Sequence, residues 1–195
     1  MERRKLRIAL DLDGVLADTI RPVCRLLNAR YSTHLTPEQY DKWNAWEITK
    51  ISKNEFLRTL DEAWFNWESI PPVEDNMAEK IATLNGRIDI VTGRTEATVP
   101  FAKEWLRTQE IAYDKFVRVE STAAKADLQY DVFIDDSAHL MTLIAARLFG
   151  CGVLYEQPWN RTAASMTRIY KVKRWSEIPP LLNRMSRGQG LPEHE

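Results

Sequence analysis

The sequence of 195 residues has few cysteines, few histidines and no long apolar run. Its two cysteines, Cys24 and Cys151, are too few for a disulfide framework, and we expect both to be buried thiols. The three histidines, His34, His139 and His194, are too isolated for a zinc site. No stretch approaches the roughly 20 apolar residues of a membrane span, and the basic start lacks an apolar signal segment. We therefore expect a cytoplasmic protein that does not associate with membranes.

An excess of charge of one sign is also absent. The chain contains 27 basic and 28 acidic residues, for a formal net charge of -1. This balance creates no overall field that would attract a long polyanion. We expect no extended nucleic-acid partner, although a local site for a nucleic-acid end remains an alternative.

Short apolar segments predict the strands of one parallel sheet. They lie at residues 6–12, 88–93 and 131–136, with a further candidate at 152–160. Helical patterns alternate with them at residues 76–86, where Gly86 is expected to be the C-cap, at 97–111, and at 137–150, where Gly150 closes the helix. The alternation predicts a doubly wound, Rossmann-like α/β fold, in which ligands bind at the carboxyl ends of the strands.

Residues 19–72 do not follow this alternation. Helical patterns at 20–31 and 52–67 occur there with no strand between them. Pro71 and Pro72 follow the second pattern and break the helix before the chain returns to the sheet. We interpret this segment as an inserted helical cap subdomain. Residues 1–18 and 73–195 then form the α/β core domain, with a polar tail from Ser186 that we expect to be loosely ordered.

The most informative motif follows the first predicted strand, in "IALDLDGVLAD". Asp11 and Asp13 stand one residue apart at the strand end, and Gly14 allows the chain to turn sharply. Two such carboxylates suit Mg²⁺, with Asp11 facing a docked phosphate as nucleophile and Asp13 as acid/base. The alternative is a solvated turn, because Asp and Gly are common turn residues.

Two further elements are compatible with phosphate binding. Thr92 and Gly93 end the second strand, where a hydroxyl and a backbone amide can bind a phosphate oxygen. Lys125 precedes the third strand. Each has a plainer explanation, a turn or a solvated charge, and Arg94 either contacts substrate or pairs with an acidic neighbour.

A second acidic pair, Asp135 and Asp136, follows three residues of the third strand that should be buried. Asp136 is also a candidate N-cap for the helix that begins near Ala138, a role compatible with a site role for Asp135.

Taken in this order, the four elements resemble the haloacid dehalogenase superfamily of phosphotransferases. The resemblance covers about residues 7–152 and implies that Asp11 is the nucleophile and Asp13 the acid/base. Thr92, with the adjacent Gly93, and Lys125 would bind the phosphoryl oxygens.

The same resemblance implies a Mg²⁺ site. Asp11, the backbone carbonyl of Asp13 and Asp135 would bind the metal, and Asp136 would bind it through water or orient the site.

Aromatic residues are dense in the predicted cap. Trp43, Trp46, Trp64 and Phe65 are candidates for stacking on a nucleobase, with core packing as the alternative for each. A cap after the first motif, Tyr113-Asp114-Lys115, "IDD" and "QPWN" at residues 157–160 resemble the 5′(3′)-deoxyribonucleotidase-like branch. This resemblance implies hydrolysis of nucleoside monophosphates. Alternatives are a phosphatase for another small phosphate, such as a sugar phosphate, or a binding module without turnover.

Overall fold

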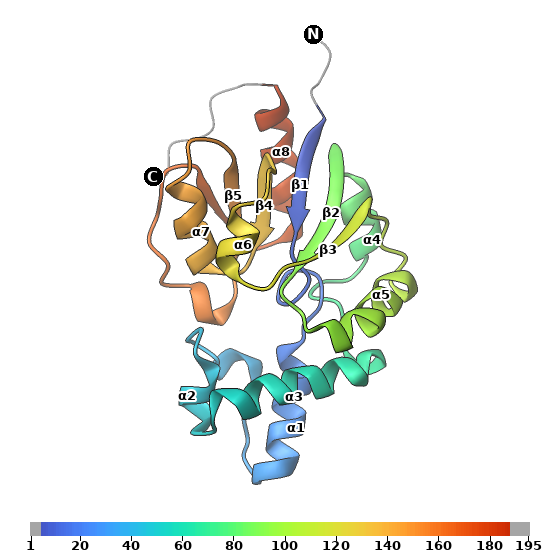
Figure 1. Cartoon of the computed structure of the whole chain (residues 1–195), viewed down its shortest axis with the longest axis vertical. Helices are drawn as coiled ribbons and strands as arrows, with labels where there is room; N and C mark the ends of the chain where they lie inside the picture. Colours follow the sequence, from blue (N-terminus) through green and yellow to red (C-terminus); the bar gives the residue numbers. More distant parts are fainter. Residues whose placement is uncertain (1–4, 188–195) are drawn as a thin grey trace.

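The computed structural model describes residues 5–187 and contains a six-stranded, fully parallel sheet (Figure 1). The strands are β1 (Leu6–Leu10), β2 (Gly86–Thr92), β3 (Lys115–Arg118), β4 (Val132–Asp135), β5 (Cys151–Tyr155) and β6 (Ile169–Val172). Their order is β3-β2-β1-β4-β5-β6: β2 and β3 extend the sheet on one side of β1, and β4, β5 and β6 extend it on the other, so the strand order reverses at β1. This is the doubly wound arrangement that the sequence predicts, and the point of reversal is where such sheets bind ligands.

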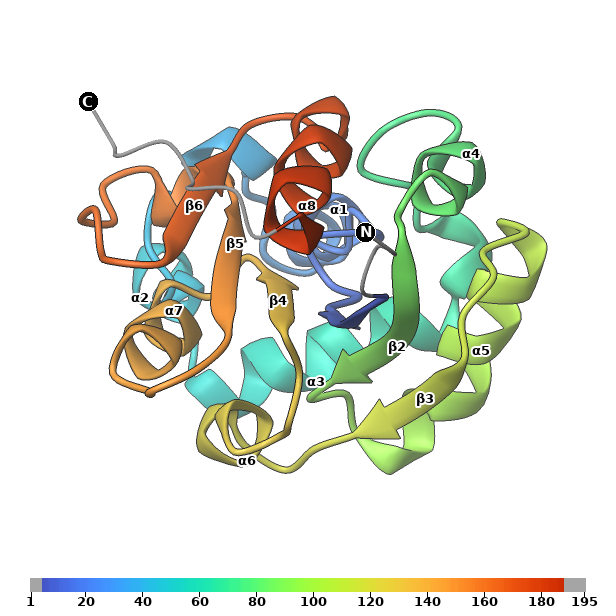
Figure 2. The same ribbon diagram turned by 90° about the horizontal axis from the view of Figure 1, so that it is seen from above.

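Helices cover both faces of the sheet (Figure 2). One face packs against α4 (Met77–Ala82), α5 (Val99–Thr108) and α8 (Ile178–Ser186), and the other against α6 (Thr122–Ala126) and α7 (Ala138–Ala145). Side chains of β1 alternate between the two layers: Ile8 and Leu10 join one buried cluster, and Ala9 joins the other. Burial on both faces explains why β1 has apolar residues at consecutive positions, from Ile8 to Leu10.

The segment between β1 and β2 is helical, as predicted. It contains α1 (Ile20–Tyr31), α2 (Ala45–Thr49) and α3 (Lys53–Phe65), which lie across the carboxyl end of the sheet (Figure 1). The two chain connections to this cap run side by side: Ala17 pairs with Pro72, and the backbone N–H of Asp18 donates to the carbonyl of Pro71 at 2.9 Å. The cap is therefore attached directly above the end of β1.

Two predicted glycine caps are wrong. Helix α4 ends at Ala82 with Thr83 as its C-cap, and Gly86 is instead the first residue of β2. A Cβ at Gly86 would lie 2.7 Å from the carbonyl oxygen of Leu6. Close approach to β1, not helix termination, therefore explains this glycine.

Gly150 also lies beyond its predicted helix end. Helix α7 ends at Ala145, with Ala146 as its C-cap, and Gly150 adopts φ +79° in the turn before β5. At the C-terminus, Ser186 still belongs to α8, and the remainder of the predicted tail, residues 188–195, lies outside the described residues. Within residues 5–187 the structure contains no helix long and apolar enough to cross a membrane.

Candidate active site

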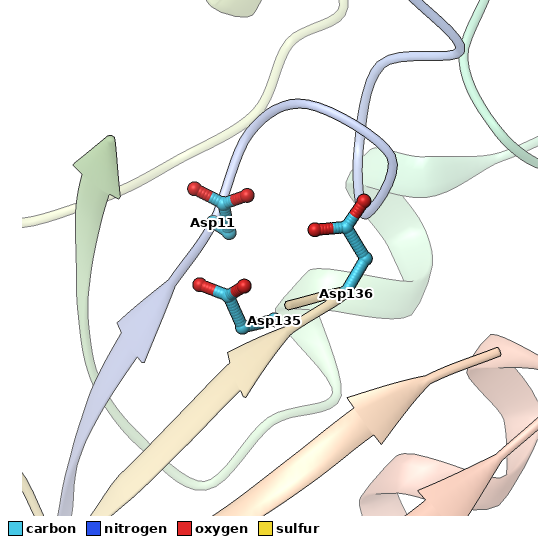
Figure 3. Close-up of side chains that lie close together, drawn as sticks. All are labelled: Asp11, Asp135 and Asp136. Carbon is cyan, nitrogen blue, oxygen red and sulfur yellow. The ribbon is translucent and has the colours of Figure 1, made fainter. Parts of the chain in front are cut away.

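Three buried aspartates converge where β1 and β4 end (Figure 3). Asp11 directly follows β1, Asp135 is the last residue of β4, and Asp136 comes next. One carboxylate oxygen from each lies within 4.8 Å of the others. The adjacent parallel strands produce this convergence, since the backbone N–H of Asp11 donates to the carbonyl of Ile134 at 3.0 Å.

Lys125 places a cation between two of these carboxylates. Its Nζ lies 2.7 Å from Oδ1 of Asp11 and 2.6 Å from Oδ2 of Asp135. It belongs to α6, whose N-terminus is capped by the hydroxyl of Ser121. Although burial opposes it, the charges of the two aspartates raise the pKa of Lys125, so the lysine stays protonated.

One lysine does not balance three buried carboxylates. Burial raises the pKa of Asp11 to about 7, against the opposing effect of Lys125, and Asp135 and Asp13 add to the rise. Burial and then the charges of Asp135 and Asp11 raise the pKa of Asp136 well above its ordinary value. The site therefore has the charge and the oxygen donors for a further cation.

Asp136 accepts hydrogen bonds from two residues that follow β5. The indole Nε1 of Trp159 donates to its Oδ2 at 3.1 Å, and Nδ2 of Asn160 donates to its backbone carbonyl at 2.8 Å. The N-cap of α7 is Ser137, whose hydroxyl accepts from the N–H of Leu140, so the N-cap role considered for Asp136 is wrong.

The carboxylate of Asp13 lies apart from the three-carboxylate group. Its Oδ1 accepts from the hydroxyl of Thr19 at 2.6 Å and from the indole Nε1 of Trp64 at 2.8 Å. Its Oδ2 pairs with Nε of Arg94 at 3.1 Å. Arg94 also lies 3.9 Å from Asp61 of α3, so its acidic neighbours come from both the core and the cap.

A cavity of about 500 Å³ lies between the sheet and the cap. Its core side includes every core residue singled out in the sequence: Asp11, Asp13, Thr92, Gly93, Arg94, Lys125, Asp135 and Asp136. On the cap side, Trp43 and Trp46 line it together with Tyr40, Phe56, Leu57 and Leu60.

The other two cap candidates do not line this cavity. Trp64 is fully buried and packs edge-on against Trp105, with its indole N–H on Asp13. Phe65 is 51% exposed and packs edge-on against Phe101. Their stacking on a base is not supported by this geometry.

The family model described as 5′ nucleotidase, deoxy (pyrimidine), cytosolic type C protein matches residues 4–187. The chain belongs to this family. It is accordingly a hydrolase of the phosphatase and 5′-nucleotidase type within the haloacid dehalogenase superfamily. No curated protein sequence matches this family member.

Solved structures share the fold of this 5′-nucleotidase family member at low identity. A haloacid dehalogenase-like protein from Agrobacterium tumefaciens has a TM-score of 0.63 and 11% identity, over 94% of this chain and 100% of that one. A haloacid dehalogenase-like hydrolase from Streptococcus pneumoniae has a TM-score of 0.63 and 14% identity, over 89% and 96%. A hydrolase of this superfamily from Bacillus subtilis, bound to magnesium, has a TM-score of 0.57 and 15% identity, over 92% and 100%.

Two site contacts in this nucleotidase-family protein were not anticipated from its sequence. Thr19 was only the first residue of the predicted cap, yet its hydroxyl donates to Asp13. Nε2 of Gln157 donates to the carbonyl of Gly14 at 2.7 Å. For Gln157 the sequence signal was the "QPWN" segment. Residues of this segment hydrogen-bond to the first motif, through Gln157, and to Asp136, through Trp159.

Proposed function

We propose that the protein is a Mg²⁺-dependent phosphomonoesterase that hydrolyses nucleoside monophosphates, with deoxyribonucleotides preferred, through an aspartyl-phosphate on Asp11. One observation carries the proposal: the aspartate and lysine cluster lies on one side of a cavity whose other side is aromatic. A phosphate on the polar side and a base on the aromatic side would use both sides of the same cavity.

The proposed metal site fits the donor set. Asp11, Asp135 and Asp136 present hard carboxylate oxygens in a buried group that Lys125 alone does not neutralise. Together with the backbone carbonyl of Asp13, these are the ligands that Mg²⁺ prefers. Bound there, the ion would neutralise charge on the phosphoryl group during transfer.

The chain's own groups would perform the transfer in two steps. A carboxylate oxygen of Asp11 attacks phosphorus, and Asp13 donates a proton to the leaving oxygen as the phosphorus–oxygen ester bond breaks. Asp13 then takes a proton from the water that hydrolyses the aspartyl-phosphate. Lys125 and the hydroxyl of Thr92, beside Gly93, bind the phosphoryl oxygens throughout.

The substrate assignment depends on the cap. Trp43 is 52% exposed, and both it and Trp46 line the cavity, which leaves aromatic surface available for a base. Trp46 also packs against Phe56, so it both completes the cap core and faces the cavity. We propose residues 19–72 as the cap subdomain that selects the substrate, on a core of residues 1–18 and 73–195.

The proposed partners are small phosphate esters only, with no extended nucleic acid and no membrane. The matching family model carries the word cytosolic in its description, and we propose the cytoplasm for this protein too.

The test is phosphate release from deoxyribonucleoside and ribonucleoside 5′- and 3′-monophosphates, sugar phosphates and 3′-phosphorylated oligonucleotides, with Mg²⁺ or EDTA. Asp11→Asn should reduce turnover on the order of 10³-fold or more, because the nucleophile is removed. Asp75→Asn is the matched control, since Asp75 is an exposed aspartate outside the cavity lining. Acid quenching during turnover should leave one phosphoryl group on the peptide that contains Asp11.

Each outcome has a defined reading. Mg²⁺-dependent release confined to nucleotides supports the proposal and ranks the bases and sugars. Release only from sugar phosphates keeps the chemistry and rejects the substrate. Full activity of Asp11→Asn rejects the mechanism.

A further inference from the structure

The hydrogen bonds of Asp13 differ between its two carboxylate oxygens. Oδ1 lies 2.6 Å from the hydroxyl of Thr19 and 2.8 Å from the indole Nε1 of Trp64. Oδ2 has the ion pair with Arg94 but no hydrogen bond from any residue between 5 and 187. Oδ1 therefore accepts two hydrogen bonds, whereas the one contact of Oδ2 is the ion pair with Arg94.

The direction of both hydrogen bonds follows from chemistry. An indole N–H can only donate, so Oδ1 is the acceptor of Trp64. The hydroxyl of Thr19 has one hydrogen, and the carbonyl of Ala17 lies 3.4 Å away, far beyond the 2.6 Å to Asp13. The hydroxyl therefore donates to Asp13 as well.

The two donors fill both acceptor positions of Oδ1. A carboxylate has about four lone-pair positions, two on each oxygen, so Oδ1 has no position left for a proton. We propose that Trp64 and Thr19 are positioning residues that saturate Oδ1 of Asp13 and leave Oδ2 to carry the transferred proton. The inference deepens the proposed function and rests on the acid/base role assigned there to Asp13.

The two donors come from different parts of the chain. Thr19 lies at the entry to the cap, immediately before α1, and Trp64 lies near the end of α3. Trp64 is fully buried and packs edge-on against Trp105 of the core helix α5, which fixes the indole plane. The proton would leave Oδ2 for the departing ester oxygen and return to Oδ2 from the attacking water, so the carboxyl group is restored in each turnover.

A leaving-group comparison tests positioning separately from stability. Alkyl phosphates, including nucleotides, have poor leaving groups that need a proton, whereas p-nitrophenolate leaves without one. Trp64→Phe removes one donor while keeping an aromatic ring, and Thr19→Val removes the other at nearly constant volume. Each should lower the single-turnover rate of ester cleavage for the best alkyl phosphate about tenfold or more, part of the usual contribution of acid–base catalysis. For p-nitrophenyl phosphate, the single-turnover rate of p-nitrophenolate release should stay within about twofold, because only the later attack by water needs Asp13 there. The substrate concentration for half-maximal cleavage should be nearly unchanged for both substrates.

Trp175→Phe is the matched control. Trp175 is also fully buried, and its indole N–H donates to the carbonyl of Val15, not to Asp13. This variant should lose comparable stability without changing the ratio of the two cleavage rates. Thr19→Val keeps the test decisive if Trp64→Phe fails to fold.

Asp13→Asn separates the proposed acid role of Asp13 from the positioning roles of Trp64 and Thr19. If it selectively lowers the single-turnover rate of alkyl phosphate cleavage and the positioning variants do the same, the inference is supported. If Asp13→Asn is selective but Trp64→Phe and Thr19→Val lower both cleavage rates in parallel or neither, only the positioning inference is overturned. If Asp13→Asn shows no selectivity between the alkyl phosphate and p-nitrophenyl phosphate, the acid role of Asp13 is rejected, and the positioning inference is rejected with it.

Discussion

Replacing Gly14 by alanine should weaken both the proposed metal site and the fold, and the two effects can be measured separately. Gly14 has φ +72°, and a Cβ there would lie 2.2 Å from Oδ2 of Asp136 and 3.1 Å from the ring of Trp159. The left-handed backbone costs alanine about 1–2 kcal/mol. Moving the Asp136 carboxylate away would break its hydrogen bond with Trp159, which contributes about 1.5–3 kcal/mol when one partner is charged.

The expected total for Gly14→Ala is therefore about 3–5 kcal/mol, a decrease in melting temperature on the order of 10 °C for a chain of this size. The displaced carboxylate should also weaken Mg²⁺ binding, about 10- to 100-fold by analogy with the loss of orienting groups at metal sites. Thermal unfolding measures the first effect. Isothermal titration of Mg²⁺ measures the second.

Gly150→Ala provides the matched comparison. Gly150 has φ +79°, and its added Cβ would lie 3.1 Å from the carbonyl of Tyr130. It precedes the amino end of β5, whereas the three aspartates lie at the carboxyl ends of β1 and β4. It should lose the backbone contribution of about 1–2 kcal/mol and keep its affinity for Mg²⁺. Equal Mg²⁺ affinity in the two variants would show that Gly14 does not protect a metal ligand, and would refute the reasoning.

Three further changes test other contacts. Although burial opposes it, hydrogen bonds from Lys80 and the Trp175 backbone lower the pKa of Glu74. The resulting stability is present above the unfolded pKa near 4.3 and lost as pH falls through the lower folded value. Glu74→Gln should therefore reduce the unfolding free energy at neutral pH by about 1–3 kcal/mol, and its unfolding free energy should decrease less at acid pH in urea titrations. The same decrease at acid pH in both proteins would contradict this. Lys125→Met leaves buried carboxylates unpaired and should cost about 3–5 kcal/mol in EDTA, with Mg²⁺ recovering part of the loss in thermal unfolding; full stability in EDTA would count against it. Trp46→Ala should raise KM for a nucleotide about 5- to 100-fold in steady-state kinetics, consistent with stacking, while KM for p-nitrophenyl phosphate stays constant; equal changes would indicate loss of cap structure.

The central strands were predictable because both of their faces are buried. β1, β2 and β4 contain consecutive apolar residues for that reason, and their carboxyl ends were marked by acidic or hydroxyl residues. The edge strands were missed. β3 has two exposed and two half-buried residues, and β6 has two half-buried residues, so neither carries an uninterrupted apolar run.

The core part of the cavity was predictable for a related reason. The carboxyl ends of parallel strands lie at one edge of a sheet, so the sequence placed Asp11 and Asp135 at the same edge. Their joint site was implied by the resemblance to the haloacid dehalogenase superfamily, and the structure shows that β1 and β4 are neighbours. The partners of Asp13 could not be predicted. Trp64 has the helical spacing of a core residue, and it is buried as that spacing predicts. The spacing does not show that its indole N–H donates to Asp13, because this contact depends on how α3 packs against α5.

The contacts separate two aspartates that lie only one residue apart. Lys125 and the end of β4 hold Asp11 within the core, whereas Asp13 is held partly by Trp64 of the cap. A carboxylate within the buried group would add its charge to three others and would be drawn toward the same cation. The turn at Gly14 and the donors on Oδ1 keep the carboxylate of Asp13 out of that group. The end of β1 therefore supplies the proposed nucleophile, Asp11, from the sheet. The proposed proton-transfer group, Asp13, is oriented in part by the helical segment that lies over the cavity.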